Sequence, residues 1–174
     1  MNALLQIGTE HLPARFLRPA LEQLKENATK ILAENRLSYK TLETYGTYKK
    51  LVLEITNLAE ISEDISKEVK GPPAKLLKGA DGKFTPQALG FAAKNGIKAE
   101  RLIVKETDKG PFIYADIKIK GIKTEKLLAT IFPDLIKSLN FAKNMVWEDS
   151  GFRFARPIRS IIALYGSKIN GFVN

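Results

Sequence analysis

The feature that most constrains the fold is a strict alternation of apolar and polar residues along positions 112–120. The apolar positions are Ile113, Ala115, Ile117 and Ile119, and the intervening ones are Tyr114, Asp116, Lys118 and Lys120. A period of two is typical of a β-strand with one face in the core and the other in solvent. Together with the run at 101–106 and the turn residues Asp108-Lys109-Gly110, it predicts an antiparallel hairpin.

Further strands are expected at 3–7, 41–48, 51–58, 151–155 and 158–165. The runs 41–48 and 51–58 flank Lys49-Lys50 and predict either one long bent strand or a tight hairpin. Asn170-Gly171 predicts a type I′ turn after the last strand. Because so little sequence follows that turn, we expect the chain to be a piece of a longer protein.

Three segments have the pattern of amphipathic helices. In the first, apolar residues recur at spacings of three and four: Leu17, Leu21, Leu24, Ala28 and Ile31. Pro19 predicts a kink there, or else a helix that starts near Arg18. The second helix follows the capping pair Thr85-Pro86, and the third follows Thr124 and is kinked or split by Pro133.

The order of these elements is β-α-β-β-α-β-β-α-β-β, without the regular alternation of strand and helix that a parallel sheet requires. An α+β fold with helices packed on a mainly antiparallel sheet is therefore expected. Residues 61–70 fit a short helix or a polar extension. The chain forms either one domain, or a core of residues 1–61 and 111–174 into which segment 62–110 is inserted.

The residue inventory argues against most enzyme chemistry. The chain has no Cys and one His, and it lacks the glycine-rich phosphate-binding, zinc-protease and serine-hydrolase motifs. His11, beside Pro13, fits a surface or capping role. We therefore predict no catalytic residue and no metal site. The absence of Cys, and so of disulfides, favours a cytoplasmic location. No apolar run is long enough to span a membrane and no signal segment is recognisable, so no membrane partner is expected.

The charge is the unusual part of the composition. With 28 basic and 19 acidic residues the chain carries a net charge of +9, and its isoelectric point is about 9.6. Residues 1–60 contribute +1 and residues 61–174 contribute +8. Such an excess favours a polyanionic partner, RNA or DNA before phospholipid.

Arginines recur at every third position near the end of the chain, as Arg153, Arg156 and Arg159, with no acidic residue after position 149. Guanidinium groups bind phosphate through two parallel hydrogen bonds, so these residues are candidates for RNA binding. The alternative is that they are structural ion-pair partners. In one strand, Arg153 and Arg159 would share a face and Arg156 would lie on the other, which argues against a single patch.

Lys49 and Lys50, preceded by Tyr45 and Tyr48, form a second basic and aromatic spot. They are also candidates for RNA binding. The alternative is an exposed turn whose lysines keep the molecule soluble.

Six short motifs occur in an order that resembles the N-terminal part of the bacterial glycyl-tRNA synthetase beta subunit. They are Gln6-Ile7-Gly8-Thr9-Glu10-His11-Leu12-Pro13, Tyr45-Gly46-Thr47-Tyr48-Lys49-Lys50-Leu51, Gly71-Pro72, Gly90-Phe91-Ala92, Thr107-Asp108-Lys109-Gly110 and Phe154-Ala155-Arg156-Pro157-Ile158-Arg159. Two of these motifs depart from the family pattern. The family has Glu-Glu at Glu10-His11 and Thr-Pro-Arg-Arg at residues 47–50, where lysine keeps the charge without the bidentate fork.

This resemblance implies a longer beta subunit in a heterotetramer of two alpha and two beta chains. The alpha subunit of this family holds the class II active site and would bind ATP and Mg, so this segment is expected to bind no cofactor and to be catalytically inactive. Its implied partners are the alpha subunit, the rest of the beta subunit and tRNA(Gly). The competing interpretation is a purely structural docking module that never contacts RNA.

Overall fold

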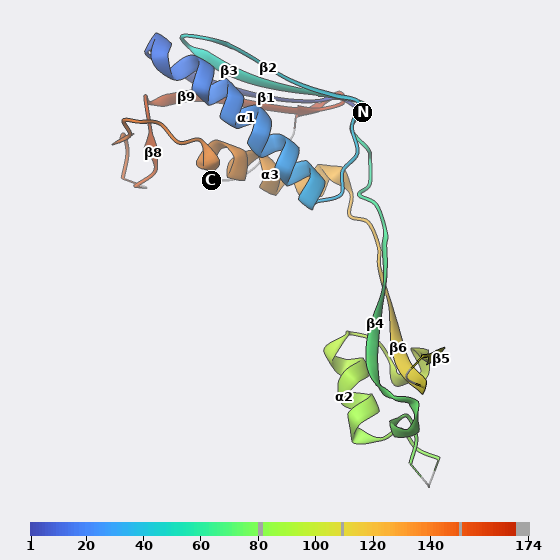
Figure 1. Ribbon diagram of the computed structural model, residues 1–174. Helices are drawn as coiled ribbons and strands as arrows, with labels where there is room; N and C mark the ends of the chain where they lie inside the picture. The colour runs from blue at the N-terminus through green and yellow to red at the C-terminus, as the bar shows by residue number, and fades with distance from the viewer. Residues whose placement is uncertain (80–81, 109, 150, 170–174) are drawn as a thin grey trace. The chain divides into compact units, whose positions relative to one another are not determined.

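The alternating segment that dominates the sequence forms strand β6 (Gly110–Ile119), but it lies outside the main sheet. The computed structural model describes residues 1–79, 82–108, 110–149 and 151–169. The chain forms two compact units (Figure 1). Met1–Glu63 and the chain from Ile122 onward make up the core unit, and Asp64–Gly121 is the inserted unit.

The inserted unit is longer than the segment 62–110 considered above, and its boundary has a clear cause. Strand β6 pairs with β4 (Ile65–Pro73) on one side and β5 (Leu102–Thr107) on the other, so it cannot belong to the core sheet. Within the core unit the two connecting segments are held together where the chain leaves and returns. There the Ser62 N–H donates to Ile122 O at 2.9 Å, and the Ile122 N–H donates to Ser62 Oγ at 2.9 Å.

The core sheet has five antiparallel strands in the order β10-β9-β1-β3-β2. They are β1 (Ala3–Thr9), β2 (Thr41–Thr47), β3 (Lys50–Thr56), β9 (Ile158–Tyr165) and β10 (Lys168–Ile169). Alternation along each strand directs one set of side chains into the core. Leu5 of β1, for example, lies between Leu53 and Ala163 in the register and is fully buried. The region 41–58 is therefore a tight hairpin, not one bent strand.

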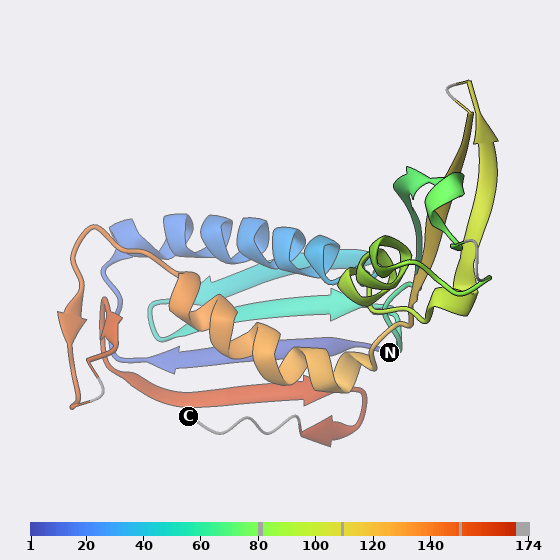
Figure 2. The same ribbon diagram turned by 90° about the horizontal axis from the view of Figure 1, so that it is seen from below.

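Helices α1 (Ala14–Glu34) and α3 (Thr124–Ser138) both cover the same face of this sheet (Figure 2). Helix α1 begins at Ala14, directly after Pro13, and continues through Pro19, so the alternative start near Arg18 is wrong. Helix α3 likewise runs through Pro133 without being split. Burial of their apolar faces stabilises both helices enough to offset the backbone hydrogen bond that each proline removes.

Two further strands of the core unit are short. Strands β7 (Met145–Val146) and β8 (Arg153–Phe154) pair with each other, and Trp147 Nε1 donates to Phe154 O at 2.9 Å. The predicted Asn170-Gly171 turn lies outside the described residues. The chain already turns between β9 and β10 after Tyr165, at Gly166, whose φ of +60° suits glycine.

The inserted unit is a three-stranded antiparallel sheet in the order β4-β6-β5, with helix α2 (Pro86–Lys94) packed on it. Two 3₁₀ turns, Ala74–Leu76 and Ala99–Arg101, connect these elements. The predicted hairpin of β5 and β6 is confirmed, although Lys109 of its turn is outside the described residues. The N-cap of α2 is confirmed as well, since Thr85 Oγ1 accepts from the Ala88 N–H at 3.2 Å.

Strand β4 replaces the short helix or polar extension expected at 61–70. Its sequence lacks a clear apolar alternation because β4 is an edge strand on which few side chains, Val69 among them, pack against the inserted unit's core. Pairing with β6 fixes it as a strand. The fold is α+β with antiparallel sheets, as predicted. In the part of the chain that is described, no helix is long and apolar enough to cross a membrane.

Candidate nucleic-acid interface

Three segments that are distant in sequence meet at one end of the core sheet (Figure 2). They are the β1–α1 connection at 10–13, the β2–β3 turn at residues 48–49 and the segment 156–159 that leads into β9. We call this region, with the neighbouring Lys50, the basic sheet end.

Backbone hydrogen bonds hold the three segments together. The Thr9 and Leu12 N–H groups donate to the carbonyls of Lys49 and Tyr48 at 2.9 and 2.7 Å, and the Glu10 N–H donates to Pro157 O at 3.0 Å. The strand order places β1 between β3 and β9, so the connection after β1 can reach both neighbours. The turn and the 156–159 segment are thereby fixed against one common segment.

Two of the predicted arginines also contact this connection. Arg156 Nε donates to His11 O at 3.1 Å, and Arg159 Nε donates to Glu10 Oε1 at 2.6 Å. The side chains of Arg159 and Glu10 are 68% and 44% exposed, so solvent screens their ion pair strongly. The pair orients the guanidinium and leaves it at the surface.

The two departures from the family pattern lie against each other in this region. The His11 and Tyr48 rings have their centroids 4.5 Å apart at an interplanar angle of 41°. The Lys49 ammonium lies 6.0 Å from the centroid of the Tyr48 ring, and Tyr48 itself is 54% exposed. An exposed aromatic ring bordered by a cation can stack on a nucleotide base.

The charge of the basic sheet end is strongly positive. Four of the five predicted RNA-binding residues are in it: Lys49, Lys50, Arg156 and Arg159. One carboxylate, that of Glu10, lies among them. Among the described residues, no ion pair involves Lys49 or Lys50. These two lysines are exposed and can bind phosphate without first breaking such a pair.

Arg153 lies elsewhere. It belongs to β8 and lines a pocket of about 510 Å³ together with Lys137, Asn140, Asn144 and Phe152. The chain is interrupted around Pro157, as expected, so Arg153 and Arg159 lie in different strands and the argument from alternation along one strand does not apply. The three arginines do not form one patch, and the one set apart is Arg153, because Arg156 and Arg159 both contact the β1–α1 connection.

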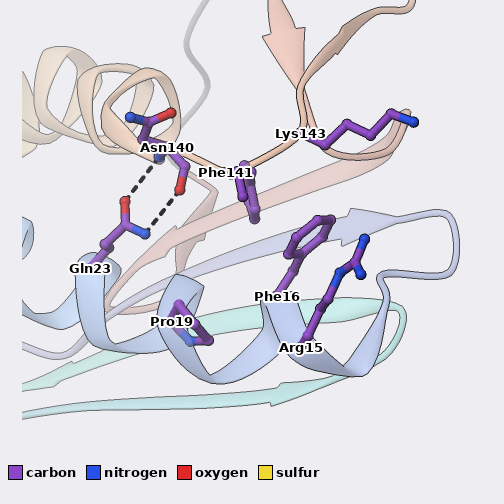
Figure 3. A pocket seen from close by; sticks show the side chains of 8 residues that line it. Arg15, Phe16, Pro19, Gln23, Asn140, Phe141 and Lys143 are labelled. Carbon is purple, nitrogen blue, oxygen red and sulfur yellow. Dashed lines mark hydrogen bonds between the residues drawn. The ribbon is translucent and has the colours of Figure 1, made fainter.

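A second pocket, of about 500 Å³, lies between the start of α1 and the segment after α3 (Figure 3). Phe16 and Phe141 line it, and Gln23 forms two hydrogen bonds of 2.9 Å with the backbone of Asn140. Arg15 and Lys143 supply its two cations. These two residues could not be singled out from the sequence, because they are far apart along the chain and no motif connects them.

In the described residues, no group of three or more His, Asp or Glu side chains gathers in a way that could hold a metal ion. The chemistry of the basic sheet end is that of a cationic, partly aromatic surface. It can bind anions and stack on planar groups.

Residues 3–172 match the family described as the glycyl-tRNA synthetase beta subunit. The chain belongs to this family. It is 44% identical over 97% of its length to the glycine–tRNA ligase beta subunit of Desulforamulus reducens and 41% identical over 97% to that of Moorella thermoacetica. It is 38% identical over 97% to the corresponding subunit of Clostridioides difficile. The chain spans about a quarter of these relatives, covering 24%, 24% and 25% of their lengths.

The motifs that indicated the glycyl-tRNA synthetase beta subunit family are grouped in space. Three of them, at 6–13, 45–51 and 154–159, form the basic sheet end and the strands that lead to it. In the inserted unit, a Cβ on Gly71 would come within 2.6 Å of the Phe91 ring, so the motifs at 71–72 and 90–92 pack together. In the motif at 107–110, Thr107 Oγ1 donates to Gly110 O at 2.7 Å.

Proposed function

We propose that the chain is a non-catalytic segment of glycine–tRNA ligase that binds tRNA(Gly) at its basic sheet end and supports assembly with the alpha subunit. In this proposal the ligase forms glycyl-tRNA with ATP, in the cytoplasm, as a heterotetramer of two alpha and two beta subunits. The class II active site, ATP and Mg²⁺ belong to the alpha subunit.

The convergence of Lys49, Lys50, Arg156 and Arg159 on one end of the sheet supports this function. Phosphate contacts from basic side chains supply most of the sequence-independent affinity for nucleic acids. The bond from Arg156 Nε to His11 O uses one of five N–H donors and orients the guanidinium plane. Such prior orientation lowers the entropy that the side chain loses when it binds phosphate.

Titration of tRNA(Gly) with the 174-residue chain at several salt concentrations tests RNA binding. We expect log affinity to fall with log salt, and the variant Lys49→Glu/Lys50→Glu to weaken binding about tenfold or more while reducing the slope by about two. The matched control is Lys30→Glu/Lys126→Glu, which reverses two exposed lysines on α1 and α3. Equal effects of both double variants, or no salt dependence, would overturn the proposed RNA contact.

Glycine-dependent exchange of pyrophosphate into ATP tests the non-catalytic part of the proposal. We expect the 174-residue chain to show no exchange above background, and the complete complex of alpha and beta subunits to be active under the same conditions. Exchange by the chain alone would contradict the assignment of the active site to the alpha subunit.

A docking function is favoured by the face of the core sheet opposite the helices. A row of residues crosses four strands on this face and includes three large apolar side chains. In register it runs through Ile162, Gln6, Val52 and Tyr45. Ile162 is 43% exposed and Tyr45 is 54% exposed. An apolar sheet face of this kind fits contact with another part of the synthetase.

The variant Ile162→Glu in the full-length subunit, expressed with the alpha subunit, separates docking from RNA binding. Loss of the complex on size-exclusion chromatography, with unchanged tRNA affinity of the 174-residue variant chain, is the result expected for docking. A complex that forms normally would exclude a docking role for this row.

A further inference from the structure

In the described part of the inserted unit, one face of the sheet has no helix of this unit packed on it. Helix α2 packs on the other face (Figure 1). There Ala88 and Ala92 belong to one buried cluster with the fully buried Ile113 and Ala115 of β6. Because neighbouring residues of a strand point to opposite faces, Phe112 and Tyr114 lie on the face without the helix. Both rings are partly exposed. We call this surface of β4, β6 and β5 the open face.

A lysine from each outer strand reaches one of the two rings. In register, Lys70 of β4 lies opposite Tyr114, and Lys105 of β5 lies opposite Phe112. Their ammonium groups cross diagonally: Lys70 Nζ is 3.7 Å from the centroid of Phe112, and Lys105 Nζ is 5.9 Å from that of Tyr114. The open face thus has two neighbouring aromatic rings on the central strand, each bordered by a cation.

Lys105 already forms an ion pair with one carboxylate, that of Glu68. Its ammonium lies 2.5 Å from Glu68 Oε1, so the side chains from the two outer strands meet above the central strand. Both side chains are close to half-exposed, at 45% and 46%, and such a pair is weak enough to exchange its anion. A phosphate can take the place of the carboxylate with the same charge-assisted hydrogen bond.

The inserted unit also carries more than its share of positive charge. Residues 64–121, one third of the chain, contain 12 basic and 7 acidic residues and so hold +5 of the net +9. The net positive charge of the unit attracts a polyanion in preference to an acidic or neutral small molecule, while the open face itself carries Glu68 and Asp116 beside Lys70 and Lys105.

We propose that the open face binds unpaired nucleotides of a single-stranded RNA. Two bases stack on Phe112 and Tyr114, which are two residues apart and therefore about 7 Å apart along the strand. The flanking phosphates pair with Lys70, which leaves its place over the Phe112 ring, and with Lys105, which exchanges Glu68 for phosphate. Stacking platforms bordered by basic side chains are the usual means of binding single strands, and a duplex hides its base faces. This site uses none of the residues of the basic sheet end.

Fluorescence anisotropy with a labelled uridine octamer and the 174-residue chain tests this site. We expect the octamer to bind more tightly than an RNA duplex of the same length, and Phe112→Ala/Tyr114→Ala to lower its affinity about tenfold or more. The matched control is Leu89→Ala, which truncates an exposed apolar side chain on α2 in the same unit and should change affinity less than twofold.

Glu68→Gln gives a test of opposite sign that a folding defect cannot mimic. Removing the carboxylate frees Lys105 and lowers the repulsion of phosphate, so octamer affinity should rise about threefold or more. An affinity that stays the same or falls would overturn the proposal. Unchanged octamer binding by Phe112→Ala/Tyr114→Ala would also overturn it. If that variant instead lost binding to the alpha subunit, the open face would be assigned to a protein partner.

Discussion

Glu10 and Arg159 are 149 residues apart in the sequence, and their Oε1 and Nε atoms lie 2.6 Å apart. The pair joins the β1–α1 connection to the start of β9, where Arg159 is the second residue. It lies beside the contact of Arg156 with His11. It places the one carboxylate of the basic sheet end directly on one of its arginines. Both side chains are exposed enough that the pair orients the arginine more than it stabilises the fold.

Replacement of Glu10 by Gln should therefore strengthen binding of tRNA(Gly). The change removes a negative charge from the binding surface and frees Arg159. The affinity at low salt should therefore rise about threefold, and the fall of log affinity with log salt should become steeper by about one. Salt-dependent titration measures both. Glu43→Gln is the control, because Glu43 forms a similarly exposed pair of 2.8 Å with Lys25. A larger gain from Glu43→Gln than from Glu10→Gln would contradict the role of the basic sheet end.

Gly71 is required by packing, since a Cβ there would lie 2.6, 2.7 and 3.0 Å from three atoms of the Phe91 ring. Gly71→Ala should displace this ring of α2 from β4 and destabilise the inserted unit by about 1–3 kcal/mol. Hydrogen exchange should show faster exchange in α2 and little change in α1. Equal loss of protection in both helices would show that the two units do not unfold separately.

Gly90 lies in the middle of α2 and is expected to respond in the opposite way. A Cβ there meets no heavy atom within 4 Å, and the backbone conformation is compatible with alanine. Gly90→Ala should stabilise the inserted unit by about 0.5–1 kcal/mol, because alanine loses less conformational entropy on folding. Thermal denaturation measures the shift. A lower melting temperature would contradict this prediction and show that the helix does not accommodate alanine at this position.

Burial raises the pKa of the Tyr165 phenol above its ordinary value, and the nearby charges of Glu60 and Glu125 act in the same direction. Below a pH of about 10 the phenol is neutral in both states, and its contribution to stability is complete. At higher pH the unfolded chain ionises first, so stability falls as pH rises towards the folded pKa. Urea denaturation at pH 8 and pH 11 should show a smaller alkaline loss for Tyr165→Phe than for the unchanged protein. Parallel losses would mean that other groups cause the alkaline destabilisation.

Much of the fold follows from local patterns. The alternation at 112–120 predicted β6, the spacing of Leu17, Leu21 and Leu24 predicted α1, and Thr85-Pro86 predicted the start of α2. In each of these segments one face is buried, so the period of apolar residues records the backbone conformation. Strand β4 was missed because it is an edge strand with few buried side chains, and pairing with β6 alone makes it a strand.

The sequence by itself determined the α+β class, the family and the identity of the basic residues, because these depend on periodicity, composition and motifs along the chain. Only the tertiary structure decided that Arg156 and Arg159 meet Glu10-His11 and the Tyr48-Lys49 turn while Arg153 lies apart. That arrangement arises from the strand order β9-β1-β3, which brings together segments about 40 to 150 residues apart through backbone hydrogen bonds. Apart from the missing N–H of proline, backbone groups are the same in every residue, so no local pattern of side chains records which strands they join.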